Sequence, residues 1–181
     1  MPIVIIKNLL AEDEKRKVIE STKSYENIVY IGSRTWDRFD RIYKIYSDKT
    51  FAGVCAVNIF GNYAKFGPLV LLPEFHGSGL EKKLITNIYK IEKKNFRLYV
   101  GSSNPIVWKI IKGLDFKEIK SKVIPFSVLL IYLKMSLNVL FAGEFLPFLK
   151  DLMRKSKSFP NRNKLRHFYF IQKYHLTTSF P

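Results

Sequence analysis

The sequence has little of three things: cysteine, acidic residues and long uninterrupted apolar segments. Cys55 is the single cysteine in 181 residues, so no disulfide forms within the chain. A cytoplasmic location is expected, because free thiols persist in a reducing compartment. Cys55 lies in the apolar stretch FAGVCAVNIF, which favours a small buried side chain over a reactive nucleophile. The composition, 47% apolar and 25% charged residues, is that of a folded domain and excludes disorder throughout.

The most apolar region, residues 123–149, is interrupted by Lys134 and Glu144 and by two prolines, Pro125 and Pro147. No uninterrupted part of it approaches the ~20 residues that a bilayer-spanning helix needs, so no integral membrane segment is expected. Contact with a membrane surface stays an open alternative. The N-terminal stretch MPIVIIKNLLAEDEKRK becomes charged after a short apolar run, which argues against a signal peptide.

Acidic residues are half as numerous as basic ones: 15 Asp and Glu against 31 Lys and Arg, a formal net charge of +16. Such an excess attracts polyanions, which include nucleic acids, anionic lipids and phosphorylated cofactors. In residues 138–181, eight basic residues stand against Glu144 and Asp151, and nine Phe and Tyr residues are interleaved. Two roles are open for these aromatic side chains: stacking on nucleic acid bases, or packing against the core or against a partner subunit in a homodimer.

Apolar periodicity and turn residues predict alternating strands and helices up to about residue 136. The predicted strands are residues 3–7, 39–46, 51–60, 64–73, 96–103, 116–123 and 126–135. The predicted helices are residues 8–25, 80–94 and 104–116, with a further helix at about 138–157 in the tail. The short turns SDKT and GNY join the strands between residues 39 and 73 into an antiparallel meander. This order predicts an α/β domain with a mixed, mostly antiparallel central sheet flanked by helices, followed by a basic C-terminal extension.

The stretch HGSGLE, residues 76–81, connects the last strand of the meander to the next helix. Gly77 and Gly79 lack the Cβ atoms that would hold an anion away from the backbone. The first amides of a helix have no intrahelical partners, and the helix dipole favours negative charge there. The turn is therefore a candidate phosphate site, and a plain turn is the alternative. A P-loop is excluded because no Gly-Lys-Ser/Thr is present, and a dinucleotide fingerprint because the third glycine is missing.

The longer stretch VLLPEFHGSGLEKKLI resembles the coenzyme-A-binding motif of the GCN5-related N-acetyltransferase (GNAT) superfamily. In that motif a strand ends in Val/Leu-x-Pro, and Arg/Gln-x-x-Gly-x-Gly/Ala opens a helix. A second stretch, LYVGSSNPIVWKIIKGLDFKEI, resembles the family's next strand, its Asn-headed helix and its closing Gly-Phe. The order of elements from residue 3 to about 136 is also similar. The resemblance implies a GNAT-like acyltransferase domain over residues 1–137, with residues 138–181 as an extension.

The resemblance implies acetyl-CoA as the cofactor and no metal site. The cofactor-binding residues that it implies are Val70, Leu71 and Leu72 for the pantetheine arm, His76, Gly77, Ser78, Gly79, Leu80 and Glu81 for the pyrophosphate, and Asn104 at the head of the second motif's helix.

The sequence departs from the family pattern at several positions. His76 stands where Arg or Gln is usual, Glu81 replaces a small residue, and Ile111 stands where a tyrosine often protonates the leaving thiolate. Residues 51–73 contain no acid, so the usual carboxylate base is missing. The catalytic residues are therefore left unassigned. The nearest titratable side chains are Tyr63, Tyr99 and His76.

The sequence thus predicts an acyl-CoA-dependent N-acyltransferase that transfers acetyl to a primary amine by direct attack. Specificity for the unidentified acceptor is expected from residues 20–40, around an exposed Trp36, and from the tail. The alternative is a weakly active or inactive GNAT-fold protein that binds nucleic acid through its basic surface and C-terminal extension. The two functions combine in an acetyltransferase that acts on RNA-associated substrates.

Overall fold

The computed structural model describes residues 3–25, 28–120, 124–156 and 165–170. The strands are β1 (Ile3–Lys7), β2 (Arg41–Ser47), β3 (Thr50–Phe60), β4 (Tyr63–Leu71), β5 (Arg97–Ser102), β6 (Lys117–Ile119) and β7 (Arg166–Phe170). The helices are α1 (Glu12–Ser24), α2 (Ser33–Trp36), α3 (Leu80–Glu92), α4 (Pro105–Lys112), α5 (Phe126–Phe141) and α6 (Phe145–Ser156), with a short 3-10 turn η1 (Pro73–Phe75).

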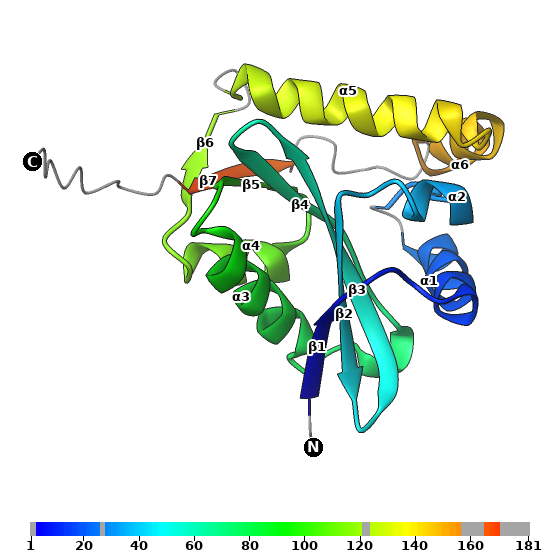
Figure 1. Ribbon diagram of the computed structural model, residues 1–181, viewed down its shortest axis with the longest axis horizontal. Coiled ribbons are helices and arrows are strands. Elements are labelled where there is room, and N and C mark those ends of the chain that lie inside the picture. The colour runs from blue at the N-terminus through cyan, green and yellow to red at the C-terminus, as the bar shows by residue number, and fades with distance from the viewer. Residues whose placement is uncertain (1–2, 26–27, 121–123, 157–164, 171–181) are drawn as a thin grey trace, which may run out of the picture.

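The strands form one seven-stranded sheet in the order β1-β2-β3-β4-β5-β7-β6 (Figure 1). Neighbouring strands are antiparallel except β4 and β5, which run parallel. The predicted α/β class with a mixed, mostly antiparallel sheet is confirmed, and the predicted meander forms as β2, β3 and β4.

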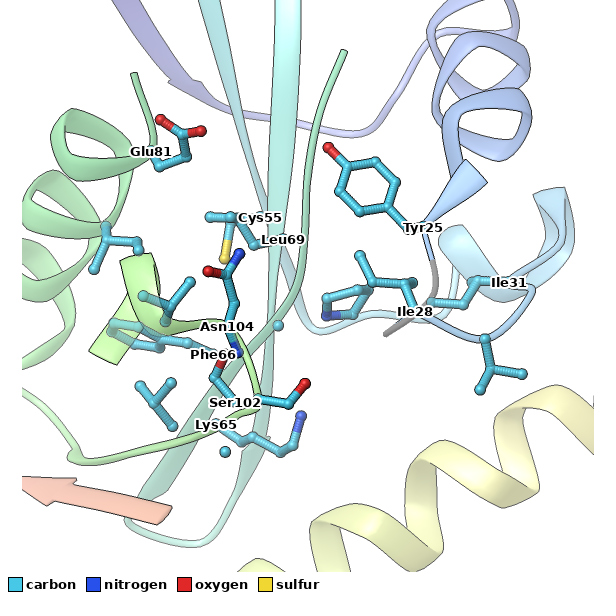
Figure 2. A pocket seen from close by; sticks show the side chains of 18 of the residues that line it. Tyr25, Ile28, Ile31, Cys55, Lys65, Phe66, Leu69, Glu81, Ser102 and Asn104 are labelled. Carbon is cyan, nitrogen blue, oxygen red and sulfur yellow. Dashed lines mark hydrogen bonds between the residues drawn. The ribbon is translucent and has the colours of Figure 1, made fainter. Parts of the chain in front are cut away.

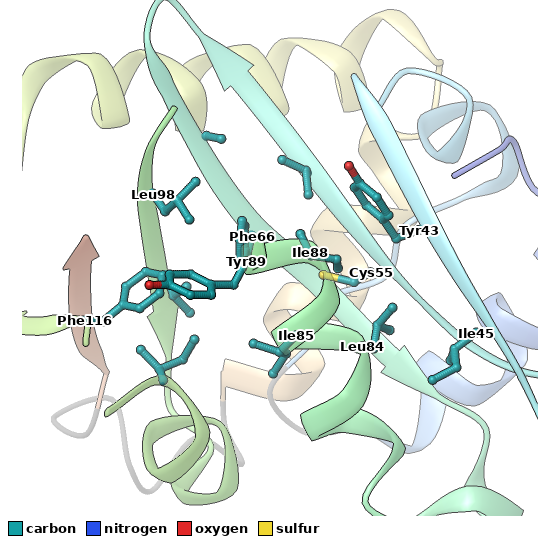
Figure 3. Close-up of a cluster of buried hydrophobic side chains, with 14 of the residues drawn as sticks. Tyr43, Ile45, Cys55, Phe66, Leu84, Ile85, Ile88, Tyr89, Leu98 and Phe116 are labelled. Carbon is teal, nitrogen blue, oxygen red and sulfur yellow. The ribbon is translucent and has the colours of Figure 1, made fainter. Parts of the chain in front are cut away.

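Helices cover both faces of the sheet (Figure 1). On one face α3 and α4 pack against the central strands, and the close-up in Figure 3 shows Leu84 and Ile88 of α3 beside Tyr43 of β2. Leu84 and Ile88 are fully buried because apolar residues of α3 recur every three or four positions and so share one side of the helix.

The other face is covered by α1, α2 and α5. Val18 of α1 and Trp36 of α2 are fully buried there, next to the side chain of Val54 on β3. The expectation that Trp36 is exposed is wrong. The short helix α2 directs the ring into the core, where it packs edge-on against Phe39 with the ring centroids 5.1 Å apart.

The prediction of a strand at residues 126–135 is wrong, because these residues belong to the helix α5. Val128, Ile131 and Val139 are its buried positions, and their spacing is helical rather than alternating. A short apolar run fits a strand or a helix equally well until its inward-facing positions are known. The segment after α4 therefore contributes one short strand, β6, instead of the predicted strand pair.

The segment predicted as a C-terminal extension supplies a strand of the central sheet. β7 lies between β5 and β6, and its Phe168 is fully buried in the main core. The predicted boundary between residues 137 and 138 falls inside α5. Local pattern could not reveal this pairing, because both partners of β7 lie far earlier in the chain.

No single described helix is long and apolar enough to cross a bilayer. The α5 and α6 helices meet the length and composition criteria together, as a pair bent by 120°.

Candidate functional site

The strands β4 and β5 separate partway along their length. Their parallel ladder runs from Tyr63–Arg97 to Phe66–Val100, whereas β4 continues to Leu71 paired only with β3. Gly67 follows the last paired residue and has φ +105°, a conformation that a residue with a side chain rarely adopts. The result is a wedge-shaped opening in the sheet, bounded by the free edge of β4.

The free edge of β4 presents backbone groups to the opening. The Leu72 amide donates to Ala52 O at 2.9 Å and therefore faces β3. Backbone groups alternate in direction along a strand, so those of Val70 also face β3, whereas those of Leu69 and Leu71 face the opening. Of the three positions expected to bind pantetheine, only Leu71 presents its backbone groups to the opening. Leu69, which was not among them, presents its own there as well.

A cavity of about 610 Å³ occupies the opening and continues toward the face of the sheet that α1, α2 and α5 cover (Figure 2). Five of the ten predicted site residues line it: Leu71, His76, Gly77, Glu81 and Asn104. The other five are not among its lining residues: Val70, Leu72, Ser78, Gly79 and Leu80. Val70 and Leu72 instead place their side chains in the core under α1 and α2.

The glycine turn leads into α3 as predicted. Gly77 and Gly79 have φ +75° and +78°, so both use the freedom that glycine provides. Within the described part of the chain, the amides of Gly77, Gly79, Glu81 and Lys82 make no hydrogen bond. These unpaired amides lie in the turn and in the first positions of the 13-residue helix α3, where backbone amides and the helix dipole favour an anion.

The remaining amides of the turn hold its shape. His76 N donates to Pro73 O at 3.1 Å, Ser78 N to Phe75 O at 3.3 Å, and Leu80 N to Ser78 Oγ at 3.4 Å. His76 and Ser78 thus stabilise the turn through their backbone while their glycine neighbours leave amides free.

The His76 side chain meets Tyr25, which lies just after α1. The Tyr25 hydroxyl donates to Leu71 O at 2.7 Å and lies 2.5 Å from His76 Nε2. Burial raises the pKa of Tyr25. Tyr25 was not predicted, and no local pattern around it signals this contact.

Asn104 stands at the head of α4, as expected, and caps this helix. Its Oδ1 accepts from Ile106 N at 2.9 Å, and Pro105 occupies the first position of α4. The side chain lies at the wall of the cavity in Figure 2.

Lys65 is a cavity residue that the sequence reasoning missed. It is 6% exposed, and its Nζ lies 5.0 Å from the centroid of the Tyr132 ring on α5. Burial lowers the pKa of Lys65 to about 8. A lysine inside the otherwise apolar strand AKFGPLVLLP was the available signal, because a charged residue in a central strand has to be accommodated inside.

Three other reactive side chains considered from the sequence, those of Tyr99, Tyr63 and Cys55, are packed against neighbouring side chains. Tyr99 is fully buried, and its hydroxyl lies 2.5 Å from His167 Nδ1 on β7. Tyr63 stacks on Tyr169 away from the cavity. Cys55 is fully buried, and burial raises the pKa of its thiol to about 12, which suits a core residue and not a nucleophile.

Comparison with solved structures identifies the fold. The chain superposes on ribosomal-protein-S18-alanine N-acetyltransferase from Escherichia coli with a TM-score of 0.52 and 12% identity, covering 65% of this chain and 80% of that one. An acetyltransferase of the GNAT family from Staphylococcus aureus gives a TM-score of 0.53 and 16% identity, covering 68% and 91%.

A longer superposition is found with N-acetylglutamate synthase from Neisseria gonorrhoeae, solved with coenzyme A and N-acetyl-glutamate. Its TM-score is 0.57 at 12% identity, covering 92% of this chain and 34% of the synthase. The sequence matches no protein-family model and no curated protein. The three structural likenesses show that the chain has the fold of the GNAT superfamily.

Proposed function

We propose that this chain is an acyl-CoA-dependent N-acyltransferase that uses acetyl-CoA and acylates a primary amine. The observation that carries the proposal is the opening between β4 and β5, because its cavity reaches the turn whose amides are unpaired. A thioester with a long polar arm and a pyrophosphate fits such an arrangement. The arm lies along the free edge of β4, and the pyrophosphate lies at the start of α3.

The pyrophosphate is held by the free amides of Gly77, Gly79, Glu81 and Lys82. Lys82 and its neighbour Lys83 are exposed in the first turn of α3 and add electrostatic attraction. The Glu81 carboxylate, which lines the cavity, turns outward when the cofactor binds.

The transfer step needs an amine beside the thioester carbonyl and a donor for the oxyanion. The amine nitrogen attacks the carbonyl carbon, and the Leu69 amide, which faces the opening, donates to the oxygen. The C–N bond forms, the C–S bond breaks, and the proton lost by the nitrogen ends on the coenzyme A thiolate. The products are an amide and a free thiol.

The proton moves through water in this proposal. Of the described residues on β3 and β4, none is acidic, and Ile111 is fully buried where the family often has a tyrosine. Catalysis then rests on positioning of the amine and on the oxyanion donor.

Isothermal titration with acetyl-CoA tests the binding step. We expect saturable binding. If no binding is detected at acetyl-CoA concentrations of roughly hundreds of micromolar, the binding free energy is weaker than about −5 kcal/mol and the proposal is rejected.

Gly79→Glu should abolish binding, because it adds a carboxylate and a side chain at the anion site. Its matched control is Gly61→Glu. Gly61 also has positive φ and open space around it but lies in the β3–β4 turn, so the two variants carry similar backbone strain.

The alternative function, nucleic acid binding on the same fold, is supported by the net charge of +16. In the described part of the tail, Phe168 is buried in the core and is not available for base stacking. RNA binding measured at two salt concentrations separates the two functions. Tight, steeply salt-dependent binding without acyl transfer would favour the alternative.

A further inference from the structure

Lys65 places a buried ammonium group at the wall of the cavity without an anionic partner. Among the described residues, Lys65 makes no ion pair and no hydrogen bond, and its Nζ lies over the face of the Tyr132 ring. Figure 2 shows its nitrogen directed into the cavity beside Ser102. A buried charge is costly unless it is paired, so this position favours a ligand that brings negative charge.

The position of Lys65 separates it from the pyrophosphate site. Its Nζ lies beside Gly67, 4.0 Å from where a Cβ on that glycine would stand, at the point where β4 leaves β5. In Figure 2, Lys65 and Glu81 lie at opposite ends of the cavity. The glycine turn, next to Glu81, supplies the anion site for the cofactor, so the Lys65 ammonium faces the acceptor end.

Apart from Lys65 and hydroxyl side chains such as those of Ser102 and Tyr132, the acceptor end is apolar. Its wall comes from the segment after α1, from α5 and from α6, and includes Ile28, Ile31, Phe39, Met135, Val139 and Phe148. Such a surface favours a hydrophobic group on the acceptor. Among the described lining residues, Glu81 is the one carboxylate, and it lies at the cofactor end. A polyamine would therefore find no anionic partner beside Lys65.

We propose that the acceptor is a small amine that carries a carboxylate and an apolar side chain, as an apolar amino acid does, and that Lys65 binds the carboxylate. The proposal rests on the proposed N-acyltransferase function and names its substrate class. With the carboxylate held by Lys65 and the side chain against α5 and α6, the α-amine is left to face the opening. Lys65 is a specificity-determining residue here and takes no part in bond making.

Acetyl transfer to L-leucine, leucinamide and spermidine tests the substrate class with the wild-type protein. Leucine should be acylated with the lowest KM. Leucinamide, which lacks the carboxylate, should show a KM about tenfold higher or more, as expected for loss of a charged hydrogen bond. A wild-type preference for leucinamide or spermidine would overturn the assignment.

The Lys65→Met variant tests whether Lys65 binds the carboxylate of the acceptor. It should raise the KM for leucine about tenfold while kcat changes less than the KM, and it should remove the preference for leucine over leucinamide. Lys65→Arg should restore part of that preference. Lys90→Met, a change at an exposed lysine on α3, is the matched control and should behave as wild type. An unchanged leucine KM in Lys65→Met would contradict the proposal.

Binding provides a readout that does not need turnover. Leucine, methionine and phenylalanine are titrated into protein saturated with coenzyme A, and at least one should bind more tightly than leucinamide. Absence of binding by all three, with coenzyme A bound, would refute the acceptor class alone. Absence of coenzyme A binding would instead refute the proposed function.

The outer face of α5 supports a second, independent inference. Leu129, Leu133, Leu137 and Leu140 are 39–55% exposed and recur at helical spacing, so they form one apolar stripe. Phe126 at the start of α5 is 72% exposed. A stripe of this extent on an exposed helix marks an interaction surface.

The charges on α5 and the net charge of the chain indicate which kind of partner binds this stripe. No residue of α5 is acidic, and its Lys134 is paired with Asp40 at 2.6 Å. The net charge of +16 repels a second copy of the chain and attracts an anionic surface. We infer that the α5 stripe docks on an anionic lipid surface, with its leucines in the interface.

Sedimentation with vesicles tests this surface. The protein should bind phosphatidylcholine vesicles that contain phosphatidylglycerol, and the double variant Leu133→Gln, Leu137→Gln should bind about tenfold less. Leu9→Gln, at a leucine that is 59% exposed before α1, is the control and should leave binding unchanged. Equal binding by the double variant, or a wild-type dimer in solution that the double variant dissociates, would overturn the inference.

Discussion

The Tyr25 hydroxyl donates a hydrogen bond to the carbonyl oxygen of Leu71, 46 positions later in the chain, at 2.7 Å. This bond joins the segment after α1 to the free end of β4. It uses one carbonyl of the edge that β5 leaves uncovered, and His76 Nε2 approaches the same oxygen at 3.2 Å.

Tyr25→Phe should lower the free energy of unfolding by about 1 kcal/mol, the usual net value of a hydrogen bond of this kind. The measurement is urea denaturation. Tyr30→Phe is the control, because the Tyr30 hydroxyl makes no hydrogen bond to a described residue. An equal loss in the two variants would show that the Leu71 bond contributes nothing specific.

Lys65 should make stability rise at alkaline pH. In the folded protein burial lowers the pKa of Lys65 to about 8, against an ordinary value of 10.5. Between these values the unfolded chain binds more protons, so the free energy of unfolding increases with pH. Lys65→Met should lack this increase and should be the more stable protein at pH ~7, where the buried charge is present. Parallel pH profiles of the two proteins between pH ~7 and ~10.5 would contradict the burial of this ammonium.

Glu14 should contribute stability that is lost in acid. Burial raises the pKa of its carboxyl, but hydrogen bonds from Tyr46, the Ala11 amide and Lys44 outweigh that effect and lower the pKa below 4.5. A lowered folded pKa gives stability that is present above the unfolded pKa and lost as pH falls through the folded one. Glu14→Gln should therefore be less stable than wild type at neutral pH, and the difference should shrink below pH ~4.5. Urea denaturation at several pH values measures it, and a constant difference would be the contrary result.

Phe168→Ala should destabilise the whole domain by about 3–5 kcal/mol, because the ring is fully buried in the main core. Phe126→Ala, at a ring that is 72% exposed, should change stability by less than about 0.5 kcal/mol. Thermal unfolding followed by circular dichroism compares the two. A small effect of Phe168→Ala would mean that β7 is not part of the cooperative unit.

Much of the fold could be predicted from the sequence because its signals are local. Asn104 before Pro105 marks the start of α4, and the glycines at 77 and 79 mark the turn into α3. The strands of the meander are separated by short turns, so their order follows from the chain itself. The start of each of these elements depends on a few neighbouring residues.

The sequence-based predictions were wrong or incomplete where tertiary packing determines the secondary structure or the burial of a residue. Residues 126–135 are apolar enough for a strand or a helix, and packing of the segment against β3 and β4 selects the helix. Trp36 looked exposed among polar neighbours, and the fold of α2 buries it. Tyr25 and Lys65 acquire their roles from elements that are distant in the chain. The sequence around Tyr25 gives no signal of its contact, and a lysine within an apolar strand marks Lys65 only as an unusual position.

The placement of β7 also constrains how the protein is made. Within the described sheet, β6 pairs with β7 and with no other strand, although it is synthesised before β7. On the ribosome, β1 to β5 are able to pair as they emerge, but residues 117–119 have no neighbour until residues 166–170 leave the exit tunnel. The nascent chain therefore carries an uncovered β5 edge until residues 166–170 emerge and pair with it.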